Sequence, residues 1–286
     1  MGAALLLIIA AAFAHAGWNF FAKRAGAAGS GFVWLTATCS AVLYLPVMVG
    51  AIITSGIPPW QAWLLGVATS AGVHLGYFLV LQRGYALGDM SIVYPVARGT
   101  GPLLAIVAAI VLLGERPGVL GLLGGLLVVA GVFVIGFSGG LSHSRARRTS
   151  AAFGVLTGLL IAVYTLWDAH VVTTLGLSPL VYEWSSHTLR SVLMLPYVLT
   201  RPAHIASLWK TYRRHVLAVA LLSPLAYLLV LFAMQLAPVS LVAPARELSI
   251  VLAGIMAWRL LGEPQPARRL TGAMIVLAGV VVLGLA

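Results

Sequence analysis

Charged side chains are scarce in this sequence, and acidic ones are the scarcest. Of its 286 residues, 8% are charged, 6 are Asp or Glu, and 61% are hydrophobic. A soluble domain carries about 25% charged residues, so this composition cannot cover a water-facing surface. The scarcity excludes an ordinary soluble protein and predicts that lipid surrounds most of the chain.

Cysteine is also rare, since Cys39 is the one cysteine of the chain and lies within an apolar run. No disulfide within the chain can form, and the redox compartment is not indicated. The sequence lacks a Gly-x-x-x-x-Gly-Lys-Ser/Thr loop, a His-Glu-x-x-His motif and Cys/His metal spacing. It therefore predicts no cofactor and no metal, and active transport would need an ion gradient, a counter-substrate or a partner chain.

What the sequence does contain is a series of long apolar runs. A membrane-spanning helix needs about 20 mostly apolar residues, whereas strands of a membrane barrel alternate over about 10. Ten continuous runs fit the helix, separated by glycine and proline. They are 2–22, 31–54, 60–82, 90–113, 117–138, 152–174, 180–199, 215–236, 239–261 and 266–285. The predicted fold is an all-α integral membrane protein with ten transmembrane helices.

The basic residues predict an orientation. The formal net charge is +11, but these residues fill short gaps between the apolar runs, so nucleic acid is not an expected partner. The odd-numbered gaps hold Lys23, Arg24, Arg83, Arg145, Arg147, Arg148, Arg201, Lys210, Arg213, Arg214, Arg268 and Arg269. The even-numbered gaps hold Arg116. Because basic loops stay in the cytoplasm, the odd-numbered loops are predicted to be cytoplasmic and both termini outside, in the inner (cytoplasmic) cell membrane.

The two halves of the chain resemble each other at a spacing of 148 to 150 residues. The matches, in order, pair Trp18-Asn19 with Trp167-Asp168, Leu43–Pro46 with Leu193–Pro196, Tyr77 with Tyr227, Ala97-Arg98 with Ala245-Arg246, Gly114-Glu115 with Gly262-Glu263, and Gly124 and Gly131 with Gly272 and Gly279. Matches in this order, one of them a rare intramembrane arginine, indicate a duplication.

Each half holds five spans, so the second copy must enter the membrane upside down. Inverted repeats around a central cavity are typical of secondary transporters. The predicted organisation is a first five-helix repeat at 1–140, a basic linker at 141–150 and a second repeat at 151–286.

Two segments that contain Leu-Leu-Gly-Glu carry a family resemblance. One runs over 97–104 and 112–117, the other over 244–249 and 260–264. With Trp18-Asn19 near the end of the first span, they make the whole chain resemble the EamA-like transporters of the drug/metabolite transporter superfamily. The resemblance implies a ten-helix fold with a central cavity, and export or exchange of small metabolites such as amino acids. Many relatives are expected to have cytoplasmic termini, opposite to the orientation that the charges predict here.

Arg98 and Arg246 are repeat-related charges near the middle of spans four and nine. A charge inside a bilayer costs roughly a few kcal/mol, so both should face the bundle interior. A guanidinium binds a carboxylate or phosphate through two parallel hydrogen bonds, which predicts a site for a metabolite carboxylate, phosphate or phosphonate. The alternative is a structural ion pair with Glu247 or Asp168.

Span seven carries a polar stripe. Glu183, His187 and Arg190 are spaced i, i+4 and i+7, so they share one helical face. The stripe should face inward as part of a substrate cavity, with Glu183 or His187 as a proton carrier. The alternative is a self-satisfied stripe near the helix entry, where Glu183 reaches water.

Aromatic rings with a polar tip make suitable walls for an amphiphilic substrate. The further substrate-binding candidates are Trp18, Asn19, His74, Tyr77, Tyr94 and Tyr164. The proton-coupling candidates are Asp168, Glu183, Glu247 and His15. For His15 and His74, the alternative is a histidine satisfied by a neighbouring helix. Aromatic residues near span ends are predicted at the membrane–water interface: Trp34, Trp60, Trp63, Tyr182, Trp184 and Trp209.

Glu115 and Glu263 are predicted to cap the free amides that begin the next helix. The glycines of spans five and ten are predicted to allow close helix packing.

Together these patterns predict a secondary transporter of small metabolites that works by alternating access and is not an enzyme. Its partners are a small-molecule substrate, the bilayer, and a proton or counter-substrate. A homodimer is left open, because two fused halves can complete a cavity. The alternatives are a membrane-embedded enzyme that uses His15, His74 or Asp168 on a lipophilic substrate, a passive channel, and an interaction subunit.

Overall fold

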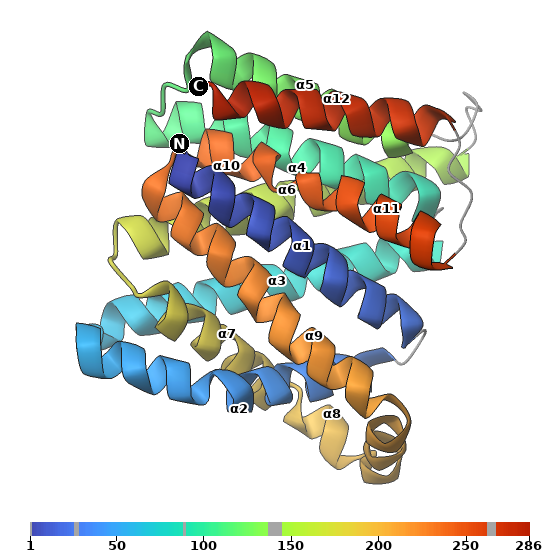
Figure 1. The fold of residues 1–286 in the computed structure, drawn as a ribbon. Coiled ribbons are helices and arrows are strands. Elements are labelled where there is room, and N and C mark those ends of the chain that lie inside the picture. The colour runs from blue at the N-terminus through green and yellow to red at the C-terminus, as the bar shows by residue number, and fades with distance from the viewer. Residues whose placement is uncertain (1, 26–28, 88–89, 137–144, 262–266) are drawn as a thin grey trace.

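The computed structural model describes residues 2–25, 29–87, 90–136, 145–261 and 267–286, and within them it contains twelve helices and no strand. Figure 1 shows the helices packed side by side in one bundle, with both termini at the same end. The helices are α1 (Gly2–Arg24), α2 (Gly29–Ser55), α3 (Trp60–Leu87), α4 (Met90–Leu113), α5 (Gly118–Gly136), α6 (Arg145–Thr173), α7 (Pro179–Leu193), α8 (Leu195–Leu199), α9 (Pro202–Leu236), α10 (Val239–Ala245), α11 (Leu248–Leu261) and α12 (Ala267–Gly284).

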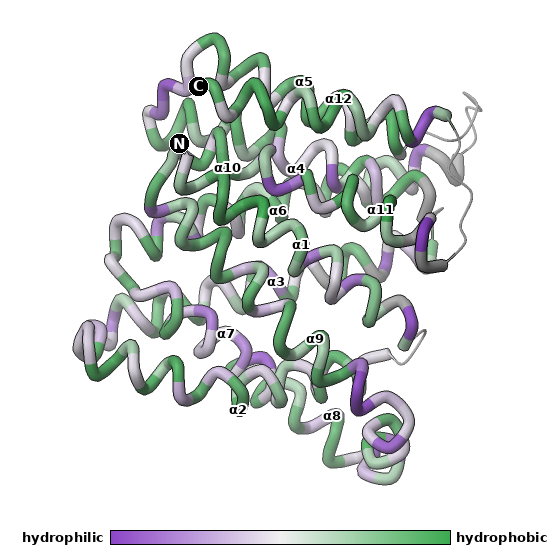
Figure 2. The backbone as a smooth tube through the Cα atoms, viewed as in Figure 1, coloured by the Kyte–Doolittle hydropathy of each residue, from purple (hydrophilic) through white to green (hydrophobic). Residues whose placement is uncertain are grey.

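Within the described residues, nine stretches are long and apolar enough to cross a membrane. Figure 2 shows hydrophobic residues along most of the helices, with α7 more polar than the others. Large apolar side chains such as Leu6, Ile53 and Val111 are exposed on the bundle. An exposed apolar surface of this extent needs lipid around it.

Two of the ten predicted spans are interrupted in the structure. The predicted span 180–199 is divided into α7 and α8, and neither piece is among the nine candidate spans. Pro196 lies in the first turn of α8 and has no amide hydrogen with which to continue the hydrogen bonds of α7. The predicted span 239–261 is divided into α10 and α11 at Arg246 and Glu247, although 239–256 still counts as a span.

Two helices begin earlier than predicted. Helix α6 begins at Arg145, inside the stretch 141–150 that the sequence predicts as a linker, and α9 begins at Pro202 rather than at 215. Lys210 and its basic neighbours therefore lie on a helix. Residues 141–144 of the linker and the predicted cap Glu263 lie outside the described residues.

Helices of the two halves pack against each other. Helix α1 packs on α9 and α11, α3 and α4 pack on α6, α2 packs on α7, and α5 packs on α12. The glycines confirm the predicted close helix packing, and the structure shows that α5 and α12 pack on each other. A Cβ atom at Gly131 would lie 2.8 Å from the carbonyl oxygen of Gly272, and one at Gly279 would lie 2.8 Å from that of Gly124. Because the pairs run in opposite order, α5 and α12 are antiparallel.

The main hydrophobic core lies near the end that carries the termini. Ile8, Leu177, Leu231 and Leu283 are fully buried in one cluster there. This cluster packs the helices together towards that end of the bundle.

Glu115 caps a helix, but not the predicted one. Its two carboxylate oxygens accept hydrogen bonds from the backbone amides of Val239 and Ser240, both at 2.8 Å. These amides begin α10, in the other half of the chain, rather than α5. The cap satisfies amide groups that the first turn of a helix leaves without partners.

Candidate functional site

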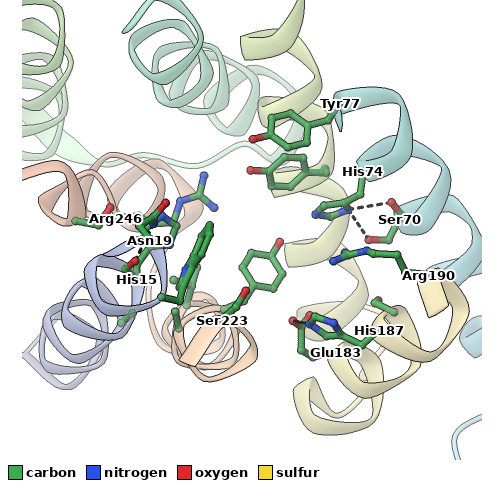
Figure 3. A pocket seen from close by; sticks show the side chains of 18 of the residues that line it. His15, Asn19, Ser70, His74, Tyr77, Glu183, His187, Arg190, Ser223 and Arg246 are labelled. Carbon is green, nitrogen blue, oxygen red and sulfur yellow. Dashed lines mark hydrogen bonds and ion pairs between the residues drawn. The ribbon is translucent and has the colours of Figure 1, made fainter. Parts of the chain in front are cut away.

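A cavity of about 370 Å³ lies in the middle of the bundle. Its lining residues on α1, α3 and α4 extend towards Asn19, Leu81 and Tyr94. These positions lie towards the end opposite the termini, so the cavity is offset towards that end. Figure 3 shows His15, Asn19 and Arg246 on one side, and His74, Arg190 and His187 on the other.

Most of the candidate residues meet at this cavity. Twelve of the fourteen line it: His15, Trp18, Asn19, His74, Tyr77, Tyr94, Arg98, Tyr164, Glu183, His187, Arg190 and Arg246. The remaining two, Asp168 and Glu247, lie behind its wall, 0% and 1% exposed. The structure brings the set together, and its part in substrate binding stays a prediction.

The break between α10 and α11 lies against the cavity. Arg246 and Glu247 form the turn between the two helices, and the amide of Glu247 donates to the carbonyl of Pro244 at 2.9 Å. Pro244 cannot supply an amide hydrogen of its own, which weakens the helix there. Broken helices at mid-membrane are typical of substrate and ion sites in secondary transporters.

Arg98 forms the ion pair that the sequence left as an alternative. Its Nη2 lies 2.9 Å from Oε2 of Glu247 and donates to the Ser249 hydroxyl at 3.3 Å. Of the two proposed acid partners, Glu247 rather than Asp168 is the one it contacts. Arg98 is therefore already largely neutralised by the protein.

Arg246 differs from Arg98 in its contacts. It is 8% exposed and lines the cavity, and its Nε has no hydrogen-bond partner. Within the described part of the chain it has no ion-pair contact, since Glu247 is held by Arg98. A buried guanidinium that lines a cavity and has no ion-pair contact in the described residues is suited to bind an anion.

The stripe of α7 faces inward, as its polarity predicts. Glu183 and His187 line the cavity together with Arg190. His187 Nε2 lies 3.0 Å from Oε1 of Glu183, so the two are paired within a single turn.

Asp168 is the centre of a polar cluster. It accepts hydrogen bonds from Ser70 Oγ at 2.8 Å, from the Tyr182 hydroxyl at 2.5 Å and from the Tyr227 hydroxyl. His74 Nε2 lies 3.8 Å from its Oδ2. The prediction that Tyr182 lies at the membrane interface is wrong: it is 1% exposed, because its hydroxyl binds this buried carboxylate.

Aromatic rings form much of the remaining wall. His74 stacks on Tyr164 with ring centroids 4.2 Å apart, and Tyr77 meets Tyr164 edge-on at 5.8 Å. His15 packs against Trp18 at 4.9 Å, and its carbonyl accepts a hydrogen bond from Asn19 Nδ2 at 2.7 Å.

Six polar lining residues were not among the candidates: Ser70, Tyr182, Ser186, Ser223, Tyr227 and Ser249. The repeat gave a signal for one of them, because Tyr227 matches Tyr77, a candidate itself. A serine in an apolar run, or a tyrosine near the end of a predicted span, carries no comparable sequence signal for a cavity position.

The apolar helices define a multi-pass membrane protein, and they enclose a cavity with charged residues in its wall. The chain belongs to the EamA-like transporter family, whose model matches residues 2–137 and 148–285. This places it in the drug/metabolite transporter superfamily and confirms the resemblance carried by the Leu-Leu-Gly-Glu segments. Membership of a transporter family favours transport over enzymatic activity.

The fold has solved relatives, and 29 chains match. One, described only as the crystal structure of a protein, is 19% identical, with a TM-score of 0.76. The match covers 100% of this chain and 97% of that one, and at this identity it shows the fold alone. A comparison with curated proteins finds no match.

Proposed function

We propose that the chain is a secondary transporter of small anionic metabolites that works by alternating access. The observation that carries the proposal is Arg246, a buried guanidinium without an ion-pair contact in the described residues, at the wall of an aromatic-lined cavity. The cavity volume of about 370 Å³ suits a small metabolite. The substrate class is a compound that bears a carboxylate, phosphate or phosphonate, amino acids included.

The helix packing supports two inverted halves, 1–140 and 151–286, joined by 141–150. By the repeat, Gly124 corresponds to Gly272 and Gly131 to Gly279, yet Gly124 faces Gly279 and Gly131 faces Gly272. Equivalent helices that cross in this reciprocal, antiparallel way are expected about a two-fold axis in the membrane plane. By the repeat, α1 corresponds to α6 and α3 corresponds to α9. Helix α1 packs on α9 and α3 packs on α6, so these two contacts are reciprocal in the same way.

The position of the cavity supports an alternating-access cycle. It is offset towards the end of the odd-numbered loops, and the hydrophobic cluster around Ile8 and Leu231 packs the helices together towards the other end. With the odd loops in the cytoplasm of the cell, this arrangement is the cytoplasm-facing state. Rocking of the two halves would open the cluster and close the cavity mouth.

The first experiment is counterflow in proteoliposomes loaded with amino acids, small organic acids, phosphonates and neutral sugars. Saturable exchange of an anion is expected. Arg246→Ala should slow it about thirtyfold or more, because truncating one partner of a buried charge pair costs roughly 2 kcal/mol or more. Arg246→Lys should restore part of the rate.

The matched control is Arg201→Ala, which removes an exposed arginine outside the cavity. It should exchange at the wild-type rate. Exchange of neutral sugars alone, or wild-type anion exchange by Arg246→Ala, would contradict the proposed substrate class. No exchange of any compound by well-folded protein would contradict the function itself.

A further inference from the structure

Asp168 joins four helices behind the cavity wall. Its Oδ1 accepts hydrogen bonds from Ser70 on α3 and Tyr182 on α7, and its Oδ2 accepts one from Tyr227 on α9. A carboxylate offers about four lone-pair positions. Three hydroxyl donors therefore leave one direction of the carboxylate for a further proton donor.

His74 lies next to this carboxylate. Its Nε2 lies 3.8 Å from Oδ2 of Asp168, too far for a hydrogen bond but close enough for an ion pair. Its Nδ1 lies 2.9 Å from the carbonyl oxygen of Ser70, which can only accept, so Nδ1 carries the hydrogen of the neutral ring. Nε2 is then the unprotonated nitrogen, directed at the carboxylate.

The same ring is in contact with the cavity. His74 lines it, its side chain is 22% exposed, and Figure 3 shows it facing the open space with Ser70 behind. A proton that arrives from the cavity can bind Nε2 and be held there by Asp168. Ser70 also connects the two, because its hydroxyl lies 3.2 Å from Nδ1 and donates to the carboxylate.

The charges around the cavity are balanced when it is empty. Three arginines, Arg98, Arg190 and Arg246, stand against three acids, Asp168, Glu183 and Glu247. The other titratable groups of the wall and the cluster are His15 on α1, His74 and Tyr77 on α3, Tyr94 on α4, Tyr164 on α6, Tyr182 and His187 on α7, and Tyr227 on α9. One anion alone would leave an uncompensated negative charge inside the membrane, which is costly.

We propose that one proton binds at Nε2 of His74, between the ring and Asp168, together with one monovalent anion in the central cavity. The bound proton cancels the charge of the anion, so the loaded carrier crosses its cycle as an electroneutral complex. On the other side the proton leaves Nε2 and the anion leaves the cavity, which restores the neutral histidine and the charged carboxylate. This inference rests on the proposed function, since it assigns the ion that is co-transported through the same cavity.

The pair of Glu183 and His187 is the rival proton site. Both residues lie on α7, so a proton there changes one contact within a single turn. The pair of His74 and Asp168 joins α3 of the first half to α6, α7 and α9 of the second. Because alternating access moves the halves relative to each other, a proton site that joins them is the one that can bias the motion.

The test is pH-driven accumulation in proteoliposomes, with the membrane potential clamped by potassium and valinomycin. Each anion of the counterflow panel is supplied with an acidic exterior. The wild type should accumulate an exchanging anion about tenfold per unit of pH difference, the limit for one proton per anion. His74→Gln and Asp168→Asn should equilibrate it without accumulation. Counterflow at equal pH, measured on the same vesicles, corrects for any loss of rate.

The matched control is His215→Gln, a histidine on α9 that does not line the cavity and should keep the wild-type accumulation. If Asp168→Asn does not fold, His74→Gln and Ser70→Ala decide the result. Accumulation lost in His187→Gln but kept in His74→Gln would overturn the assignment, as would accumulation driven by an alkaline exterior. Counterflow that is strong but insensitive to the gradient overturns only the proton assignment. Absence of counterflow for every anion overturns the proposed function as well.

Discussion

Two repeat-related arginines have different surroundings at the residue scale. Arg98 is paired with Glu247 at 2.9 Å, while Arg246 lines the cavity and has no ion-pair contact in the described residues. A buried ion pair contributes little net stability, but removal of one partner leaves an uncompensated charge. Arg98 is therefore expected to matter for folding, and Arg246 for substrate.

Arg98→Ala should lower the free energy of unfolding by about 3–5 kcal/mol, because Glu247 would remain buried and unpaired. Addition of Glu247→Gln should recover most of the loss, since the charge is then removed as well. Thermal unfolding of both variants in detergent measures the coupling as a double-mutant cycle. Arg201→Ala, at an exposed position, is the control and should change the stability by less than about 0.5 kcal/mol. Equal stability of wild type and Arg98→Ala would show that Glu247 does not depend on this partner.

At the scale of elements, two features stand out: the break between α10 and α11, and the close contact of α5 with α12. The break between α10 and α11 brings Arg246 and Glu247 to the centre of the bundle. In an unbroken helix, the backbone amide and carbonyl groups at this point would bond only to each other. The contact of α5 with α12 depends on glycine, because backbone atoms of the two helices approach too closely for a side chain.

Gly131→Leu should destabilise the protein by about 1–3 kcal/mol, the usual range for overpacking. A Cβ atom there would lie 2.7 Å from the amide nitrogen of Val276 and 2.8 Å from the carbonyl oxygen of Gly272. Gly50→Leu is the matched control, because Gly50 is exposed within α2 and a Cβ there meets nothing within 4 Å. The apparent melting temperature in detergent measures both. Equal melting temperatures for the two variants would contradict a tight contact between α5 and α12.

At the scale of the whole molecule, the distribution of charge predicts how the bundle is oriented in the membrane. Ser55 lies at an even-numbered loop and Thr200 at an odd-numbered one, and both are exposed. In a Cys39→Ala background, an impermeant maleimide added to intact cells should label Ser55→Cys and not Thr200→Cys. Permeabilised cells should label both, which controls for reactivity. The reverse pattern would place both termini in the cytoplasm, as the family resemblance implies.

The sequence by itself determined the class of fold and the charged residues of the cavity wall. Apolar runs of span length, an intramembrane arginine repeated at Arg98 and Arg246, and the stripe from Glu183 to Arg190 follow from one rule: charge in lipid is costly, so it faces inward. The rule applies to a charged residue without knowledge of which other residue it contacts. The charged candidates Arg98, Glu183, Arg190 and Arg246 all line one cavity.

The tertiary structure alone decided the partners. Glu247 pairs with Arg98, Glu115 caps α10 rather than α5, and Tyr182 is buried against Asp168. Each of these contacts joins residues from different helices or connecting segments, and two of the three join different halves, so no local period or propensity encodes them. The break at Arg246 is likewise tertiary: a turn in the middle of an apolar run is stable where neighbouring helices and the cavity satisfy its exposed backbone groups.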